Sequence, residues 1–189
     1  MHKKMSMHRI CRAIIKSRRP CSLSIVFGFV AFALLFAKTS MAANIAQPTG
    51  PVILEISGKI SHTNSGEKLI LDREQLIALG MATLTVTTPW TDGIVTFTGP
   101  KLIDVLKLAG AKGNNLSTFA INDYEVKIPV SDARKFPVIL ALNKNGQPLN
   151  IRDRGPVWII YPWGDNASLR TDIYYSRSVW QLKLVIVNE

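Results

Sequence analysis

The chain has 189 residues and a formal net charge of +10, with 23 Lys and Arg against 13 Asp and Glu. Eight of the basic residues and none of the acidic ones precede residue 40, so the part from Ala43 onward has 15 basic and 13 acidic residues, a net charge of only +2. A segment so close to neutrality lacks the basic surface of a nucleic-acid-binding protein, and we expect no nucleic-acid partner.

The first 42 residues have the pattern of an export signal. A basic stretch is followed by an apolar run from Ser24 to Ala37 and then by small residues. The apolar run is shorter than the roughly 20 residues of a membrane-spanning helix. We predict a signal peptide at residues 1–42, cleaved near Ala42 or Ala43, and a periplasmic domain at residues 43–189 that does not insert into the membrane after cleavage. The alternative is an uncleaved anchor, which leaves the same domain outside the cytoplasm.

Cysteine and histidine are scarce in the predicted domain. Both cysteines, Cys11 and Cys21, lie within the predicted signal, and the remainder contains a single histidine, His62. This composition excludes disulfides, thiolate metal sites and cysteine nucleophiles from the domain, and a Ser-His-Asp triad would have to use His62. His62 stands in the polar turn SHTNSGE, where we expect a solvated loop residue.

The first half of the domain alternates strand-like runs with helix signals. ATLTVTT alternates apolar residues with threonine, as a half-buried strand does. Asp72 is placed to cap a helix, with Gln75 closing a capping box and Gly80 ending the helix. A clearer helix has Pro in its first turn and an apolar face. In chain order we predict an arm at Asn44–Pro51, a strand at Val52–Ser57, a helix from Asp72 to Gly80, strands at Ala82–Thr88 and Ile94–Phe97, and a helix at Pro100–Gly110.

Strand-like runs dominate the second half. Asn145-Gly146 is typical of a type I′ turn and joins Leu142 to Leu149 in a hairpin. Ser131 and Asp132 are placed to cap a short helical turn through Phe136. The predicted strands are Phe119–Asn122, Tyr124–Ile128, Val138–Leu142, Val157–Tyr161 and Leu182–Val187. Many strands with a few inserted helices predict an α+β domain with mixed β-sheets and a few short helices.

Five segments follow one another in a specific order along the domain. They are FTGPKLIDVLKLAGA (97–111), INDYEVKIP (121–129), ILALNKNGQPL (139–149), RGPVWIIYPW (154–163) and YSRSVWQLKLVIV (175–187). Together they resemble the molybdopterin-binding domain of sulfite oxidase-type oxidoreductases, and more narrowly the small exported single-domain branch of that fold. The resemblance implies the sulfite oxidase-type molybdopterin-binding fold with a pterin pocket.

One departure from the family concerns the metal. In the enzymes, a cysteine shortly after the first helix binds molybdenum through sulfur. The corresponding stretch here is Ala82–Trp90, with Val86 the nearest match, and it contains no cysteine. Without a thiolate no such bond forms. We therefore expect no molybdenum, no metal ligands and no catalytic residues of the sulfite oxidase kind.

The small branch also includes proteins that resemble periplasmic pterin-binding regulators of a membrane enzyme that makes or degrades cyclic di-GMP. The resemblance thus implies a reduced pterin as ligand and the periplasmic domain of a membrane signalling protein as partner. Two alternatives remain open. The first is a molybdopterin-dependent oxidoreductase that holds its cofactor without a cysteine, and the second is a structural interaction domain that binds no small molecule.

A pterin ring needs an aromatic face for stacking, a carboxylate for its amino-pyrimidine edge and arginines for its oxygens. Asp123 is the candidate carboxylate, although Asn-Asp is also common in plain turns. Trp158 alternates with apolar neighbours, so we assign it to the core, whereas Trp163 at the end of the same strand is predicted to form a wall of the site with Arg154. The predicted pterin-binding residues are Trp90, Asp123, Tyr124, Arg152, Arg154, Tyr161, Trp163, Arg177 and Trp180, with core or solvated-turn roles as the alternatives.

Overall fold

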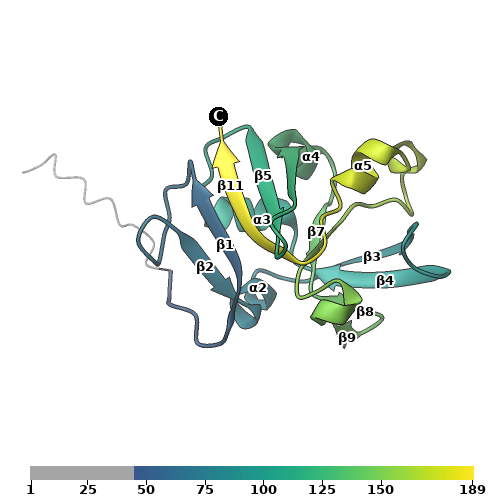
Figure 1. The fold of residues 1–189 in the computed structure, drawn as a ribbon, viewed down its shortest axis with the longest axis horizontal. Helices are drawn as coiled ribbons and strands as arrows, with labels where there is room; N and C mark the ends of the chain where they lie inside the picture. The colour runs from purple at the N-terminus through teal and green to yellow at the C-terminus, as the bar shows by residue number, and fades with distance from the viewer. Residues whose placement is uncertain (1–44) are drawn as a thin grey trace, which may run out of the picture. The chain divides into compact units, whose positions relative to one another are not determined.

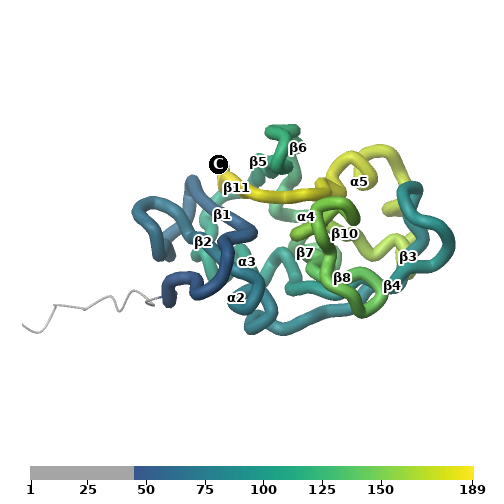
Figure 2. The backbone as a smooth tube through the Cα atoms, turned by 60° about the horizontal axis from the view of Figure 1, so that its bottom comes forward, coloured from purple at the N-terminus to yellow at the C-terminus, as the bar shows by residue number. Residues whose placement is uncertain are grey.

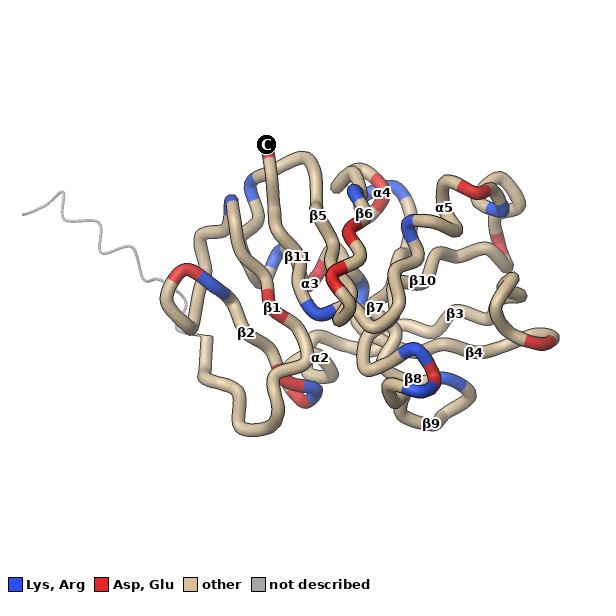
Figure 3. The backbone as a smooth tube through the Cα atoms, viewed as in Figure 1, with Lys and Arg blue, Asp and Glu red and all other residues tan. Residues whose placement is uncertain are grey.

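The computed structural model describes residues 45–189, which form β-sheets flanked by short helices (Figure 1). This architecture confirms the α+β prediction. The predicted signal peptide, its cleavage site and Asn44 lie outside the described residues. Between Ile45 and Glu189 no helix has the length and apolar character needed to span a membrane. Basic and acidic residues are interspersed along this part of the chain (Figure 3).

The larger sheet places the last strand between the first strand and a central hairpin. Its order is β2 (Leu69–Asp72), β1 (Val52–Gly58), β11 (Leu182–Asn188), β5 (Asn115–Ala120) and β6 (Glu125–Pro129). β1 and β11 are parallel, with Glu55 opposite Leu184, and the other neighbours are antiparallel. The chain can be followed in Figure 2 from α5 through the segment that leads into β11. That segment therefore connects the sheet to the helix beside the candidate site.

Two smaller sheets complete the fold. One has the order β3 (Ala82–Thr87), β4 (Ile94–Gly99), β8 (Asn143–Lys144) and β9 (Gln147–Pro148), and the other pairs β10 (Trp158–Ile160) with β7 (Ile139–Ala141). Asn145 and Gly146 have φ values of 49° and 78° between β8 and β9. Positive φ at both central residues is what a type I′ turn requires, so the predicted hairpin is confirmed.

Short helices connect the strands. They are α2 (Arg73–Ala78), α3 (Leu102–Leu108), α4 (Val130–Lys135), α5 (Asp172–Ser176) and the 3₁₀ turns η1 (Ile151–Asp153) and η2 (Ala167–Leu169). Asp72 caps α2 and Gln75 closes the capping box, as predicted. Gly80 and Gly110 follow α2 and α3 with positive φ, which confirms their role as helix ends.

Several local predictions were wrong. Pro100 precedes α3, whose N-cap is Lys101. Asp132 does not cap α4: it lies within the first turn with its side chain buried, and Pro129 is the N-cap. β5 ends at Ala120, so residues 121–124 form a turn instead of continuing a strand. β2 and α5 were not predicted, since each is too short to show a hydrophobic period. His62 is half-buried, with Nδ1 2.8 Å from the carbonyl oxygen of Leu108.

The core contains the aromatic residues of the central segment. Trp158 has no exposed surface, which confirms its assignment to the core, and its ring meets that of Phe97 edge-on at 5.3 Å between centroids. Aromatic pairs of this geometry add to the stabilisation that comes from buried area. β10, which carries Trp158, is buried throughout. Trp90 and Trp180 pack against the Trp158 ring at centroid distances of 5.9 Å and 6.2 Å, so both lie against this core.

Candidate functional site

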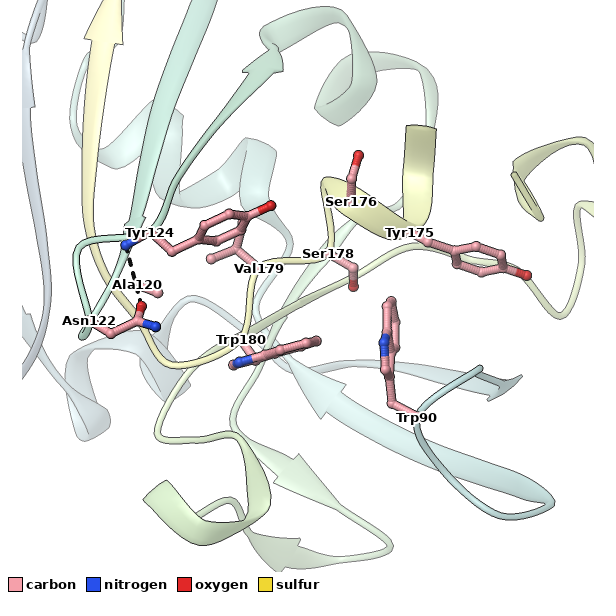
Figure 4. A pocket seen from close by; sticks show the side chains of 9 residues that line it. All are labelled: Trp90, Ala120, Asn122, Tyr124, Tyr175, Ser176, Ser178, Val179 and Trp180. Atoms are coloured by element: carbon pink, nitrogen blue, oxygen red, sulfur yellow. Dashed lines mark hydrogen bonds between the residues drawn. The ribbon is translucent and has the colours of Figure 1, made fainter. Parts of the chain in front are cut away.

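A pocket of about 350 Å³ opens between the β5–β6 turn, the loop between β3 and β4, and the segment from α5 to β11. Its size lies in the range of small-molecule sites, which begins at about 300 Å³. The lining holds four aromatic side chains, three uncharged polar ones and, in the part of the chain that the structure describes, no charged one. The lining residues are Trp90, Ala120, Asn122, Tyr124, Tyr175, Ser176, Ser178, Val179 and Trp180 (Figure 4).

Trp90 joins the pocket to the core. Its ring meets Trp180 and Tyr175 edge-on, at centroid distances of 5.7 Å and 5.8 Å, and it packs at 5.9 Å against both Trp158 and Trp163. Its backbone N–H donates to the hydroxyl of Thr88 over 3.1 Å, which helps to hold the loop. Figure 4 shows Trp90 and Tyr175 on one side of the pocket and Tyr124 and Asn122 on the other, with Trp180 between them.

The polar groups of the pocket are neutral. Asn122 Oδ1 accepts from the backbone N–H of Tyr124 over 3.3 Å, which leaves its amide group as a donor. Ser176 Oγ donates to the carbonyl of Ile173 over 2.8 Å, and Ser178 Oγ donates to the carbonyl of Ile159. Both hydroxyls therefore keep lone pairs that can accept hydrogen bonds. The pocket can match an uncharged heterocycle with both N–H and carbonyl groups.

Arg154 packs against one tryptophan of the core and one of the pocket lining. Its guanidinium carbon lies 5.4 Å from the ring centroid of Trp158 and 5.5 Å from that of Trp180, within the range of a cation–π contact. The carbonyl of Arg154 accepts from the backbone N–H of Gln181 over 2.9 Å. Arg154 thus supports Trp180 and is not itself part of the pocket lining.

A buried polar cluster lies beside the pocket. Asp132 Oδ2 accepts from Tyr161 OH and from Arg177 Nη1, each over 2.9 Å. Burial, together with the neighbouring Asp132 carboxylate, raises the pKa of Tyr161 far above its ordinary value, so the hydroxyl remains a donor. The Arg177 guanidinium also lies 5.5 Å from the ring of Tyr174. This cluster holds Arg177 between two residues of the pocket wall, Ser176 and Ser178.

The structure brings three predicted residues, Trp90, Tyr124 and Trp180, into the pocket lining. Asp123 is their neighbour in the β5–β6 turn, but its side chain is 81% exposed and its carboxylate pairs with Lys183 at 2.6 Å. Arg152 lines a separate groove. Asp123 and Arg152 therefore lie outside the lining of this pocket.

Trp163, which was predicted to form a wall of the site, does not line this pocket. Trp163 and Tyr161 have no exposed surface, because the rings of Trp90 and Tyr175 pack against Trp163 and the α4 carboxylate binds Tyr161. Trp163 Nε1 is also the one buried side-chain polar atom between residues 45 and 189 without a hydrogen-bond partner. Trp163 therefore supports the pocket from below.

Sequence reasoning missed much of the lining: Ala120, Asn122, Tyr175, Ser176, Ser178 and Val179. The segments INDY and SRSVW, which contain or adjoin most of these residues, were identified, but the individual positions were not. Small and polar residues in a turn carry no periodic signal that separates a pocket wall from a solvated loop. The only usable signal was their proximity in the chain to Tyr124, Arg177 and Trp180.

Residues 45–189 supply no thiolate ligand for a molybdenum ion. The only cysteines of the chain are at positions 11 and 21, before the described domain. Within residues 45–189 no group of three or more His, Cys, Asp or Glu side chains could hold a metal. Thiolate ligation of the sulfite oxidase kind therefore has no donor in this domain.

The comparisons with known proteins agree with the architecture. The family model of the oxidoreductase molybdopterin binding domain matches residues 72–165, about half of the chain. The solved structure of the sulfane dehydrogenase SoxCD from Paracoccus pantotrophus is similar, with 18% sequence identity and a TM-score of 0.54, over 71% of this chain and 37% of that one. No curated protein matches the sequence. At the level of fold, this chain therefore carries a sulfite oxidase-type molybdopterin-binding domain.

Proposed function

We propose that the domain binds a reduced pterin in the aromatic pocket and serves as a ligand-responsive regulator. The observation that carries this proposal is a lining of four aromatic rings and three neutral polar side chains without a thiolate. A pterin is a flat, bicyclic ring, and stacking of such a ring on an aromatic side chain is worth about 1–3 kcal/mol by analogy with nucleobases. The amide of Asn122 and the serine hydroxyls supply hydrogen bonds for the ring edge.

The charges around the pocket favour a pterin without a phosphate. Molybdopterin carries a phosphate, which proteins commonly bind with arginine or lysine. No lysine or arginine is among the pocket-lining residues. Two arginines near the pocket are engaged elsewhere, Arg154 with tryptophan rings and Arg177 with Asp132. A neutral pterin ring matches this lining better than the phosphorylated cofactor.

We further propose that the protein acts in the periplasm on the periplasmic domain of a membrane enzyme that makes or degrades cyclic di-GMP. The support is the export-signal pattern of residues 1–42 and the resemblance to small exported pterin-binding regulators. The similarity to SoxCD supports the fold alone, since this chain spans 37% of that chain, and sulfane dehydrogenase activity is not part of the proposal.

The test is a titration with tetrahydropterin under anaerobic conditions, followed by tryptophan fluorescence and calorimetry. We expect quenching, because Trp90 and Trp180 line the pocket. Tyr175→Ala removes a lining ring from α5, while Ile173→Ala on the same helix removes a side chain that is 59% exposed and outside the pocket. The first variant should bind more weakly and the second like the wild type. Absence of binding by the wild-type protein would refute the proposal.

A further inference from the structure

A groove of about 770 Å³ begins one residue away from the pocket. Ile121 lines the groove, whereas Asn122 and Tyr124 of the same turn line the pocket. The groove is bordered by exposed apolar side chains: Val52 and Ile121 are each 43% exposed and Ile151 is 61% exposed. Three large aliphatic residues gathered at one open groove are more than the scattered apolar residues of an ordinary surface.

The groove lies where two central strands diverge. β1 and β11 are paired from Glu55 and Leu184 onward, so Val52 and Ile53 have no partner on β11. The neighbouring ladders are irregular at the same level, with register shifts between Val52 and Leu54 and between Leu182 and Leu184. An open strand end with apolar side chains around it suits an extended polypeptide, which can add main-chain hydrogen bonds to side-chain contacts.

The charges that line the groove are of one sign. Arg152 and Lys183 line it, and no carboxylate among the described residues does. Arg152 forms no ion pair within residues 45–189, while Lys183 pairs with the exposed Asp123. Exposed ion pairs contribute little stability but select partners and speed their association. The complementary occupant is therefore an apolar segment that carries carboxylates.

Gln181 ties the groove to the pocket. It follows Trp180 in the chain; its backbone N–H donates to Arg154 O, its carbonyl accepts from Ile121 N and its Nε2 donates to Ile151 O, each over 2.9 Å. Asp123, Arg154 and Gln181 have φ values of 64°, 68° and 49°. Non-glycine residues with left-handed backbone are uncommon and cluster at functional sites. These hydrogen bonds join the loops that form walls of both cavities.

We propose that this groove docks an extended segment of a partner protein that alternates apolar residues with Asp or Glu. The proposal of a docking surface depends only on the residues of the groove. Its link to ligand binding, through Gln181 and the β5–β6 turn, rests on the proposed function of the pocket.

The test measures the fluorescence anisotropy of a labelled peptide in which Ile and Glu alternate. The protein is used as it is purified from the cells that express it, after any processing there. A peptide with Lys in place of every Glu is the control for charge. We expect the acidic peptide to bind at least about tenfold more tightly, a difference of roughly 1.4 kcal/mol. Equal binding of the two peptides, or no binding of either, would overturn the proposal.

Matched variants locate the binding. Arg152→Glu reverses a charge in the groove, and Lys112→Glu makes the same change beside Lys59, at the opposite end of β1. Arg152→Glu should weaken the acidic peptide at least about fivefold, since it replaces attraction by repulsion, and Lys112→Glu should change its affinity less than about twofold. Ile151→Ser should also weaken it. Equal effects of the two charge reversals would contradict the proposed surface.

Two further measurements identify the occupant of the groove and separate the docking proposal from the proposed function of the pocket. A dimer in analytical ultracentrifugation that Ile151→Ser abolishes would make a second copy of the chain the occupant and overturn the proposed partner. Tetrahydropterin is titrated into the same samples. Peptide binding without pterin binding refutes only the proposed function of the pocket, and pterin binding without peptide binding refutes only the docking surface.

Discussion

Arg177 donates to Asp132 over 2.9 Å, and this pair anchors the segment that forms one wall of the pocket. Arg177 stands between Ser176 and Ser178, both of which line the pocket, while Asp132 belongs to α4 and is only 5% exposed. An ion pair with a buried carboxylate restricts both partners, so the backbone of the wall is held in place. Direct contact between Arg177 and a ligand stays a prediction.

Asp132→Ala should destabilise the domain. The change leaves Arg177 and the buried hydroxyl of Tyr161 without their acceptor, and we expect the free energy of unfolding to fall by about 3 kcal/mol. Asp132→Asn keeps an acceptor oxygen and should lose less. Urea denaturation of the two variants measures both values, and an Asp132→Ala variant as stable as the wild type would show that the cluster is not structural.

Substitutions of Trp163 and Trp180 should separate an effect on stability from an effect on pterin binding. Trp163 has no exposed surface, so Trp163→Ala leaves a core cavity that should cost about 3–5 kcal/mol. Trp180 is 38% exposed and lines the pocket, so Trp180→Ala should keep the fold and lose about tenfold to a hundredfold in pterin affinity. Thermal melts and fluorescence titrations distinguish the two. The opposite pattern would indicate that Trp163 contacts the pterin.

Asn122 and Asp123 offer a direct comparison within one turn. Asn122 lines the pocket, so Asn122→Ala should weaken pterin binding about fivefold, the equivalent of one hydrogen bond of about 1 kcal/mol. Asp123 is exposed and paired with Lys183, so Asp123→Ala should change the affinity less than about twofold. Calorimetric titration of both variants with the pterin measures the two affinities. A larger loss for Asp123→Ala would identify its carboxylate as the group that binds the pterin.

Asp72 should make the stability depend on pH. Its carboxylate accepts from the backbone N–H groups of Gln75, Gly50 and Thr49 at 2.8–2.9 Å, and these bonds, led by those of Gln75 and Gly50, lower its pKa. Because the folded pKa lies below the unfolded value of about 3.9, this stabilisation is present above that pH and is lost as the pH falls through the folded pKa.

The matched variant is Asp72→Asn. Its NH₂ group must face backbone N–H groups that donate to the carboxylate in the wild type. We expect it to cost about 1–3 kcal/mol at pH 7, because the N–H groups of Thr49 and Gly50 lose the oxygen that accepted from them. The difference from the wild type should shrink at pH 3, which lies below the unfolded pKa of about 3.9, because protonation of the unfolded chain then offsets part of this stabilisation. Urea denaturation at the two pH values measures this, and a difference that does not change with pH would contradict the role of the charge.

Gly99 should not tolerate a side chain. A Cβ at this position would overlap the backbone of Leu140, which cannot rotate away. Gly99→Ala should therefore cost about 3 kcal/mol, the upper end of ordinary overpacking. Gly50→Ala is the control, since its Cβ would meet Asp72 only at ordinary contact distance. Similar melting temperatures for the two variants would be inconsistent with this close approach.

Local sequence patterns determined much of the secondary structure. The capping box of Asp72 and Gln75 and the type I′ turn at Asn145 and Gly146 were predicted correctly, because each depends on residues that lie within a few positions of one another. The order of the family-like segments determined the fold class. The same patterns excluded thiolate chemistry from the domain, since composition alone shows that residues 45–189 contain no cysteine.

Only the tertiary structure decided which aromatic residues face the pocket. Trp163 and Trp180 look alike in the sequence, yet Trp90 and Tyr175 cover the first, while the second keeps part of its surface beside Asn122 and Tyr124. These contacts join residues from β3–β4, β5–β6 and α5, which are far apart in the chain. Burial depends on what packs against a side chain from elsewhere in the fold, and local periodicity does not contain that information.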